Sequence, residues 1–488
     1  MDRQRARGRQ RRESRRSAAE TNEIADGGET FGNGGGGLET TGRYLVLLRE
    51  DAVAEGATAL TDVAGFRVAR GDELDEDGTV EAALADEGAI VFDRLGVAVV
   101  DAPPDRFRSL GIMAAESSAI LAVEPERVVR VPEPPQMTSG FFGDASVSSS
   151  ESVAAPPLTT AGDGDMMDYL RGYRDGVNHL VDGLLGTGGA VGEAMVAAAA
   201  TFDETELTWG LQATKAASSK FTGAGINVAV LDTGFDLQHP DFTGRRITSR
   251  SFVSREQVQD GHGHGTHCVG TACGPLQPGQ LPRYGVAVEA EIFVGKVLSN
   301  AGSGADSGIL AGIEWALQNQ CVVVSMSLGA SLCDLPPQPH SQVFENVGRR
   351  ALAQGTLIIA AAGNDSQRPQ RICPVNHPAN CPSIFAVGAL DPRLRVASFS
   401  CAGLSPQGGQ VDVGGPGVDV RSSWPRPRLY RTINGTSMAT PHVAGIAALF
   451  AEANPGVRGR GLISLLLQNA RRLPLPARDV GAGLVQAP

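Results

Sequence analysis

The sequence contains few aromatic residues, no long apolar run and no excess of positive charge. Phe, Trp and Tyr make up 5% of the 488 residues and hydrophobic residues make up 42%, which is typical of a soluble globular protein with a substantial core. No segment approaches the roughly 18 consecutive apolar residues that span a bilayer, so we expect no membrane span. The formal net charge of −12 argues against nucleic acid as a partner of the whole chain.

Cysteine is absent from the first half of the chain, and all seven cysteines lie between Cys268 and Cys401. Because their number is odd, at least one thiol has no partner within the chain. Cys333, Cys373 and Cys381 fall in loop-like sequence and could form a disulfide in an oxidising compartment. Spacing alone does not select the pair.

The chain divides into four predicted regions. Residues 1–40 carry an Arg-rich run and then Gly-rich sequence, with no apolar segment of the kind found in a signal peptide, and we predict a disordered tail. Residues 41–132 are predicted to form a small α+β domain. Residues 133–204 begin as a Pro- and Ser-rich linker and contain an amphipathic helical pattern. Residues 205–488 form the last region.

Local patterns predict the elements of the α+β domain and of the last region. In the α+β domain they are strands at 44–48, 89–92, 97–100 and 119–131 and helices at 51–63 and 103–114. In the last region they are strands at 227–231, 291–297, 322–328, 356–361 and 384–387 and helices at 263–273, 307–318, 343–354 and 437–452. Continuous apolar strands between helices predict an α/β fold in which a mostly parallel sheet lies between two helical layers. Reactive residues then belong at the C-terminal strand ends and the adjoining helix N-termini.

Ser437 occupies the start of one predicted helix. Small residues precede it, and Pro441 is predicted to lie in the first helical turn. There the hydroxyl would meet unpaired backbone N–H groups and the positive end of the helix dipole, which suits a nucleophile. Ser437 could equally act only as a cap of the helix.

Three other polar residues lie at ends of predicted strands or helices. Asp232 follows an apolar strand, although Asp two residues before Gly also forms turns. His264 is one of three histidines within six residues and is the best candidate for a general base. With Cys268 these histidines could bind a metal instead, but their spacing does not match a paired zinc-ligand pattern. Asn364 could donate its amide to a developing oxyanion or simply form a turn.

The four residues together indicate acyl transfer more strongly than any one of them does. The reaction needs a nucleophile, a base, a carboxylate that orients the base and donors for the oxyanion. Ser437, His264, Asp232 and Asn364 are candidates for these roles, and each lies close to a glycine that lets the backbone turn sharply. The order Asp, His, Ser along the chain is that of subtilisin.

The motifs that contain these residues resemble those of the subtilases, the subtilisin-like serine peptidases. The matching segments are 229–234, 264–267, 361–364 and 435–441. The resemblance covers about residues 205–488 and implies a subtilisin-like three-layer domain. It also implies that Asp232, His264 and Ser437 are catalytic and that Asn364 and the backbone N–H of Ser437 form the oxyanion hole.

The same resemblance implies how substrate is held. Ser327, Leu328 and Gly329 resemble the family's edge segment, which pairs with the substrate backbone as an added strand. Cys268, directly after the histidine motif, resembles the proteinase K branch. Residues 41–132 look like the family's inhibitory propeptide, which assists folding and is then removed.

The resemblance supports a calcium site only in part, so calcium stays an open alternative. Asp241 matches a carboxylate that binds calcium in many relatives, but the partner loop at 274–284 contains neither Asp nor Asn. We therefore expect that no cofactor is required and that no metal takes part in the chemistry.

From these observations we predict a serine endopeptidase that is made as a self-processing zymogen. Its partners would be protein or peptide substrates and its own N-terminal domain as an intramolecular inhibitor. One alternative is a narrow-specificity peptide-maturation protease or transpeptidase, and another is a non-catalytic module that only holds a peptide. Relatives with propeptides are usually exported, but no signal peptide is recognisable, so the prediction leaves extracellular and cytoplasmic locations open.

Overall fold

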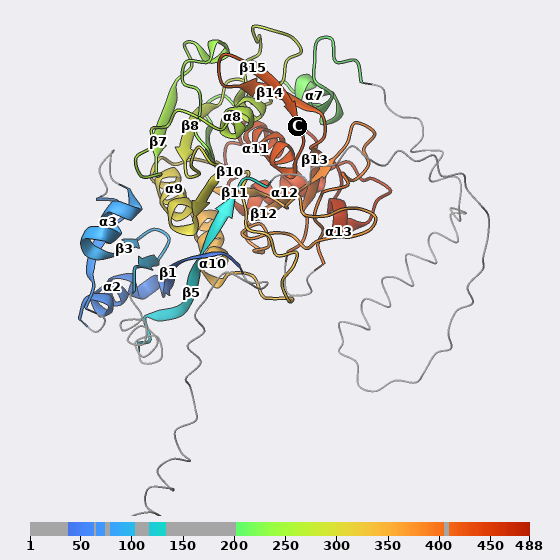
Figure 1. The fold of residues 1–488 in the computed structure, drawn as a ribbon. Coiled ribbons are helices and arrows are strands. Elements are labelled where there is room, and N and C mark those ends of the chain that lie inside the picture. Colours follow the sequence, from blue (N-terminus) through green and yellow to red (C-terminus); the bar gives the residue numbers. More distant parts are fainter. Residues whose placement is uncertain (1–37, 63–64, 74–78, 103–116, 133–201, 405–408) are drawn as a thin grey trace, which may run out of the picture. The chain divides into compact units, whose positions relative to one another are not determined.

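The computed structural model describes residues 38–62, 65–73, 79–102, 117–132, 202–404 and 409–488. These residues belong to one compact unit, Leu38–Pro488, shown in Figure 1. Most of the predicted tail, most of the predicted linker with its amphipathic helix, and the helix predicted at 103–114 lie outside the described residues. No helix in the ranges given above is long and apolar enough to cross a membrane.

In the residues that the structure describes, a mixed sheet and two helices form the N-terminal part of the unit. Its own elements are β1 (Thr40–Leu48), α2 (Val53–Asp62), β2 (Arg67–Arg70), α3 (Val80–Glu87), β3 (Gly88–Phe92), β4 (Val97–Val100) and β5 (Ile120–Arg130), with the 3₁₀ turn η1 (Glu50–Ala52) before α2. The strand order is β2-β3-β4-β1-β5-β9. Strand β9 (Ser303–Ala305) comes from the C-terminal region, so one sheet joins the two parts of the chain.

Strand β2 and helix α3 of this N-terminal part were not predicted from the sequence. Strand β2 has only four residues, and two of them are arginines, so it lacks an apolar run. Helix α3 is short, and local capping defines its ends: the Thr79 side chain accepts the N–H of Ala82, and Gly88 ends the helix with a φ of 82°. The remaining strands and α2 lie within a few residues of their predicted positions.

A seven-stranded parallel sheet forms the C-terminal part. Its strands are β6 (Asn227–Asp232), β7 (Ile247–Ser251), β8 (Glu291–Lys296), β10 (Val323–Met326), β11 (Leu357–Ala361), β12 (Phe385–Leu390) and β13 (Val413–Pro416). Their order is β13-β12-β11-β10-β6-β8-β7, and every pairing is parallel. The chain moves from β6 to one side of the sheet and then, from β10 onward, to the other, so β6 and β10 flank the switch point where parallel sheets hold their sites.

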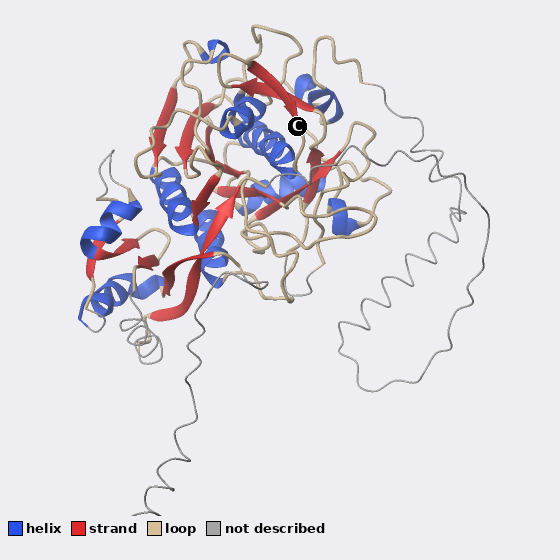
Figure 2. Cartoon of the chain, viewed as in Figure 1, coloured by secondary structure: helices blue, strands red, loops and turns tan. Residues whose placement is uncertain are grey.

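Helices cover both faces of this sheet, as predicted (Figure 2). Ala229 and Leu231 of β6 pack in a core with α9 (Asp306–Gln318) and α10 (Gln342–Ala353). Val228 and Val230 point to the opposite face, where they pack with α8 (His264–Cys273), α11 (Thr436–Ala453) and α12 (Arg460–Asn469). Because strand side chains alternate between faces, each apolar strand contributes to both cores.

The predicted position of Pro441 is wrong. It lies in the second turn of α11 rather than in the first. Pro441 has no N–H to donate to the carbonyl of Ser437, four residues earlier. That carbonyl instead accepts the Ser327 hydroxyl at 2.8 Å, so the proline frees a helix carbonyl for a contact between strand and helix.

Shorter elements complete the C-terminal part. They are α7 (Trp209–Ala213), η2 (Ala216–Ser218), η3 (Pro240–Phe242), α13 (Ala477–Val480) and the hairpin β14 (Val420–Trp424) and β15 (Leu429–Ile433). Cys333 and Cys373 form a disulfide, while Cys381, the third candidate, is a buried thiol.

Candidate active site

Asp232 and His264 meet at the C-terminal end of β6. Asp232 is the last residue of the strand and His264 is the first residue of α8, and both are buried. The Nδ1 atom of His264 lies 2.7 Å from Oδ1 of Asp232. The Nε2 atom is also buried and has no hydrogen-bond partner within the described part of the chain. A carboxylate on Nδ1 fixes the imidazole so that Nε2 is free to accept a proton.

The surroundings of His264 favour its protonated form. Burial opposes the charged imidazolium, but the Asp232 carboxylate and the neighbouring Cys268 outweigh burial and raise the pKa of His264 well above 6.5. The Cys268 sulfur lies 3.8 Å from Nδ1. Burial raises the pKa of Cys268 itself to about 11, so its thiol is neutral at neutral pH.

The histidine-rich segment does not converge on one point. Nε2 of His267 lies 3.0 Å from the Val420 carbonyl oxygen, and burial lowers the pKa of His267 to about 3. Asp232, His264 and Cys268 do place three possible ligand atoms within 4.8 Å of one another. Two of those three residues form the carboxylate–imidazole pair, so the geometry favours the general-base role over the metal-binding alternative.

Asp260 is a residue of this site that the sequence analysis missed. Its carboxylate accepts backbone N–H groups of His262, Gly263 and Thr266 at 2.7–3.0 Å, all at the start of α8. It thereby fixes the helix end that carries His264. An acidic residue shortly before a glycine-rich helix start is the pattern that could have indicated this role.

Ser437 lies at the second position of α11 and is buried. Its hydroxyl contacts the Ser327 carbonyl oxygen at 3.5 Å and does not make a hydrogen bond to His264. The helix start predicted for Ser437 is therefore present, while the serine–histidine hydrogen bond is not formed in this arrangement. Such bonds are often long before substrate is correctly seated.

Asn364 follows β11, and hydrogen bonds to its Oδ1 orient the amide so that Nδ2 points to the carbonyl of Pro132. Its Oδ1 accepts the N–H and the hydroxyl of Thr436 at 2.9 and 2.8 Å. Its Nδ2 donates to the carbonyl oxygen of Pro132 at 2.5 Å. Thr436 was not predicted, but its contact determines which way the amide points, and the amide donates to a backbone carbonyl as an oxyanion-hole donor would.

Pro132 reaches Asn364 because the segment after β5 enters the cleft as an extra strand. Arg130 exchanges two backbone hydrogen bonds with Gly329, at 2.9 and 3.0 Å, and the N–H of Val131 donates to Gly302 at 2.9 Å. Earlier residues of β5 pair with β9 on the same side as Gly302. The predicted edge segment at Gly329 therefore does pair with an extended chain, and that chain is part of the same protein. Figure 1 shows β5 running from the N-terminal sheet into the C-terminal part.

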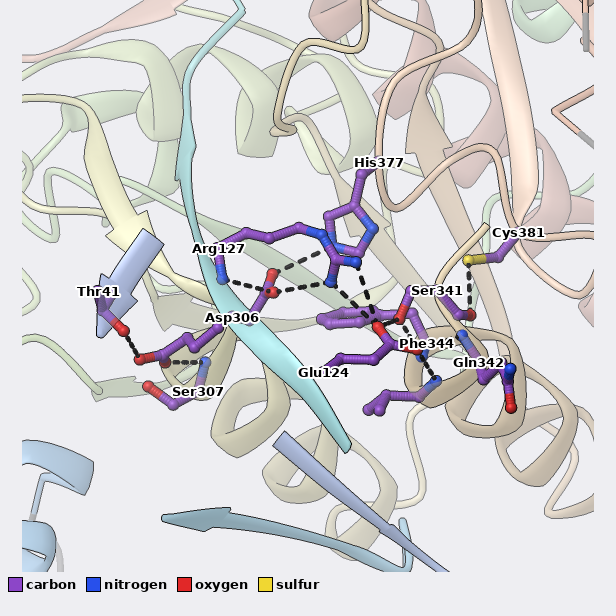
Figure 3. Close-up of polar contacts among 12 residues, drawn as sticks. Thr41, Glu124, Arg127, Asp306, Ser307, Ser341, Gln342, Phe344, His377 and Cys381 are labelled. Carbon is purple, nitrogen blue, oxygen red and sulfur yellow. Dashed lines mark hydrogen bonds and ion pairs between the residues drawn. The ribbon is translucent and has the colours of Figure 1, made fainter. Parts of the chain in front are cut away.

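Two acidic side chains of β5 also contact helix N-termini of the C-terminal part (Figure 3). Glu124 accepts the backbone N–H groups of Gln342 and Val343, at 2.6 and 3.3 Å, at the start of α10. Glu126 accepts the N–H of Ser307 at 2.9 Å near the start of α9. Carboxylates stabilise the positive ends of helix dipoles, so these contacts tie the N-terminal sheet to the two helices.

A partly buried ion-pair network lies between these two contacts. Arg127 of β5 lies 3.2 Å from Glu124 and 3.5 Å from Asp306. Asp306 also lies 3.1 Å from Nε2 of His377. Figure 3 shows Arg127 and His377 converging on Asp306 from the two parts of the chain. Burial is the largest influence on His377 and lowers its pKa.

The residues around Asp241 do not fit a calcium ion. Oδ1 of Asp241 accepts the N–H of Gly279 and the hydroxyl of Tyr430, at 2.8 and 2.9 Å, and Oδ2 accepts the hydroxyl of Tyr284 at 2.6 Å. Burial raises the pKa of Tyr430 to about 12 and also raises that of Tyr284, so both hydroxyls keep their protons. Donors therefore occupy the carboxylate oxygens that calcium would need as ligands.

Comparisons with known proteins give one family match and several relatives. The model of the subtilase family matches residues 223–483. M-protease of Shouchella clausii (strain KSM-K16) is 41% identical over 251 residues, which are 51% of this chain and 60% of that protein. Subtilisin Savinase of Lederbergia lenta is 39% identical over 283 residues, which are 57% of this chain and 96% of that protein. Subtilisin E of Bacillus subtilis (strain 168) is 40% identical over 240 residues, which are 49% of this chain and 58% of that protein.

Proposed function

The chain belongs to the subtilase family of serine peptidases, and on this basis we propose that it is a serine endopeptidase that is made with its own inhibitor. The observation that carries the proposal is the Pro132 carbonyl, which accepts a hydrogen bond from Asn364. It is accompanied by the buried Asp232–His264 pair and by Ser437 at the start of α11. A chain segment is thus held as a substrate beside a base, a hydroxyl and an oxyanion donor.

The reaction follows from the roles of these groups. The Ser437 hydroxyl attacks the scissile carbonyl while Nε2 of His264 takes its proton. Asp232 keeps the other imidazole nitrogen protonated and stabilises the imidazolium that forms. Asn364 donates to the oxyanion, and loss of such a donor in subtilisin itself lowers kcat by about 100- to 1000-fold. His264 then protonates the leaving amine, and water hydrolyses the acyl-enzyme by the same steps in reverse.

The N-terminal sheet acts in this proposal as an intramolecular inhibitor. Its last strand extends through Arg130 to Pro132 and fills the place where a substrate backbone would pair with Gly329. Self-cleavage after Pro132 would release the strand, since the Pro132 carbonyl lies at the oxyanion donor. Substrates would then bind as extended peptides in the vacated groove.

One experiment separates this proposal from a peptide-holding module. We expect the purified chain to shorten from its N-terminal side over time, with a cut after Pro132, and Ser437→Ala to stay at full length under the same conditions. Intact-mass measurements would follow both proteins. Equal shortening of both would point to another protease and would contradict self-processing.

A second readout covers the case in which neither protein shortens. A serine-directed phosphonate should label the wild type at Ser437 when it is added while mild denaturant keeps the N-terminal strand displaced. Absence of labelling as well as of shortening would overturn the peptidase proposal and favour the non-catalytic module. Product masses from an added peptide would separate hydrolysis from the transpeptidase alternative.

A further inference from the structure

A cavity of about 440 Å³ opens beside the end of the inhibitory strand. Its walls include Pro132, His264, Trp424, Arg431, Asn434 and Met438. His264 must deliver its proton to the leaving amine, so the residue that follows the cleaved bond lies against the same wall as His264. The cavity is therefore the place where the leaving part of a substrate begins.

Arg431 is fixed in this cavity by the geometry of the β14–β15 hairpin. Arg431 of β15 pairs with Ser422 of β14, and Trp424 lies two residues after Ser422 in β14. Side chains two residues apart share one face of a sheet, and the Arg431 guanidinium carbon lies 4.6 Å from the centre of the Trp424 ring. Stacking on an indole holds a guanidinium in place while leaving its N–H groups available.

The hairpin is positively charged within a protein of opposite net charge. Residues 420–433 contain four arginines and neither Asp nor Glu, while the whole chain has a formal charge of −12. Arg426 is neutralised by Asp236 at 3.0 Å, and Arg421 stacks on Tyr430 on the other face of the hairpin. Arg431 is exposed and forms no ion pair with any carboxylate among the described residues.

We propose that Arg431, held on Trp424, makes the enzyme prefer substrates with an acidic side chain directly after the cleaved bond. The planar guanidinium fork matches a carboxylate, and the partly enclosed wall of the cleft screens the pair less than open solvent does. This inference rests on the proposed peptidase function. The sequence of the chain itself agrees with the preference, because the residue after Pro132 is Glu133.

The proposal is tested by identifying the residue that follows each cleaved bond when the enzyme digests a mixture of proteins. The full-length chain, once activated by incubation, digests a mixture of denatured and alkylated proteins, and mass spectrometry identifies the cut bonds. We expect Asp or Glu after the cut about 2- to 5-fold more often than Asn or Gln, corrected for their abundance, at low ionic strength. The ratio should fall towards 1 in about 1 M salt, where charge pairs are screened.

Variants at Arg431 and a control variant at Arg428 test whether Arg431 causes the preference for an acidic residue after the cut. Arg431→Gln should bring the ratio close to 1, and Arg431→Glu should make Lys or Arg the favoured residue after the cut. Arg428→Gln removes the same charge from the exposed hairpin turn, away from the cavity, and should keep the wild-type ratio. A changed preference in Arg431→Glu cannot arise from poor folding.

The outcomes separate this inference from the function on which it rests. A wild type that cuts proteins with a ratio near 1 overturns the inference and leaves the peptidase function standing. Equal loss of the ratio in Arg428→Gln and Arg431→Gln would also overturn it, because the effect would then be one of general charge. If the wild type makes no cuts at all, the peptidase function itself fails.

Discussion

The contact between Asp232 and His264 determines how the proposed chemistry depends on pH. As the base, His264 must be neutral before it can accept a proton, and the Asp232 carboxylate raises its pKa well above 6.5 against the effect of burial. Activity should therefore be full above that raised pKa and lost as the pH falls through it. We expect the acidic limb of kcat/KM to have its midpoint above pH 6.5, measured with an uncharged peptide substrate.

Removal of the N-terminal strand does not change the direction of this prediction. Burial is the influence that lowers the pKa of His264, and burial decreases when Pro132 leaves the cleft. A profile that stays flat down to about pH 4 would contradict the role of His264 as the base, and a midpoint below pH 6.5 would contradict its raised pKa. The profile should be recorded with the processed enzyme, so that release of the inhibitor does not enter the measurement.

Individual site residues could be predicted from the sequence, but their partners could not. Asp232, His264, Asn364 and Ser437 each lie in a short glycine-containing motif, so local sequence indicates their positions at strand ends and helix starts. The amide of Asn364 is directed by Thr436, 72 residues away. A local sequence pattern does not indicate a contact between residues so far apart in the chain. In the same way, the pairing of Cys333 with Cys373 rather than with Cys381 depends on the fold.

At the scale of elements, the strands that could be predicted are those with a continuous apolar run, and the strands that were missed lack such a run. Strands β6, β8, β10, β11 and β12 are buried on both faces, and continuous apolar runs indicate such strands. The hairpin β14–β15 was missed because its residues are mostly polar and include four arginines and two prolines. Its strands are specified by pairing with each other and by packing over α8 rather than by their own periodicity.

The loop that ends at Tyr284 gives a prediction about metal dependence. Within the described residues, Tyr284 is the only donor to Oδ2 of Asp241, whereas Oδ1 accepts from both Gly279 and Tyr430. Loss of a donor to this partly buried carboxylate oxygen costs about 1–3 kcal/mol, or roughly 1–4 °C in Tm for a unit of this size. Tyr284→Phe should therefore lower Tm by that amount, and Tyr430→Phe should lower it less.

Calcium should not alter these temperatures. In a Ser437→Ala background, which prevents self-digestion, EGTA and calcium chloride should give the same Tm within about 1 °C, because donors already occupy the Asp241 oxygens. Calorimetry of the three proteins with either additive makes the comparison. A large fall in Tm with EGTA that calcium reverses would show that the protein binds calcium and would contradict this prediction.

At the scale of the whole molecule, the N-terminal sheet and the C-terminal part share one hydrophobic core. Leu47, Ile90 and Val99 of the sheet belong to the same buried cluster as Ile313 of α9 and Val347 of α10. Neither the cluster nor the entry of Pro132 into the cleft could be predicted, since both depend on contacts between segments about 200 residues apart. The sequence indicated an inhibitory domain only through its resemblance to the family.

This interface contains a buried carboxyl group whose protonation should control release of the N-terminal sheet. Glu314 of α9 is buried beneath the turn at Arg94, whose N–H lies 3.4 Å from Oε1. Burial raises the pKa of Glu314 from 4.5 to about 7. When the N-terminal sheet dissociates, Glu314 is exposed to water and its pKa returns towards 4.5. The protonated form of Glu314 is therefore favoured while the sheet is bound.

The sign of the effect follows from this difference. The contribution of Glu314 to retention of the sheet is fully present below about pH 4.5 and is lost as the pH rises to about 7, with a total on the order of 3 kcal/mol. His377 acts in the opposite direction. Burial is the largest cause that lowers its pKa in the interface, and burial decreases when the sheet departs, so protonation of His377 favours release as the pH falls. Arg127, which lowers this pKa, and Glu124, which raises it, leave together with the sheet.

The two residues can be separated by following how much N-terminal fragment stays with the processed enzyme. Size-exclusion chromatography between pH 5 and 9 measures co-elution of the fragment for each variant. Glu314→Gln remains uncharged, so it should retain the fragment at alkaline pH better than the wild type does. His377→Gln should retain it better at acid pH. If both variants released the fragment with the pH dependence of the wild type, neither group would control the interface, and the inhibitor would be held by its apolar contacts and helix caps alone.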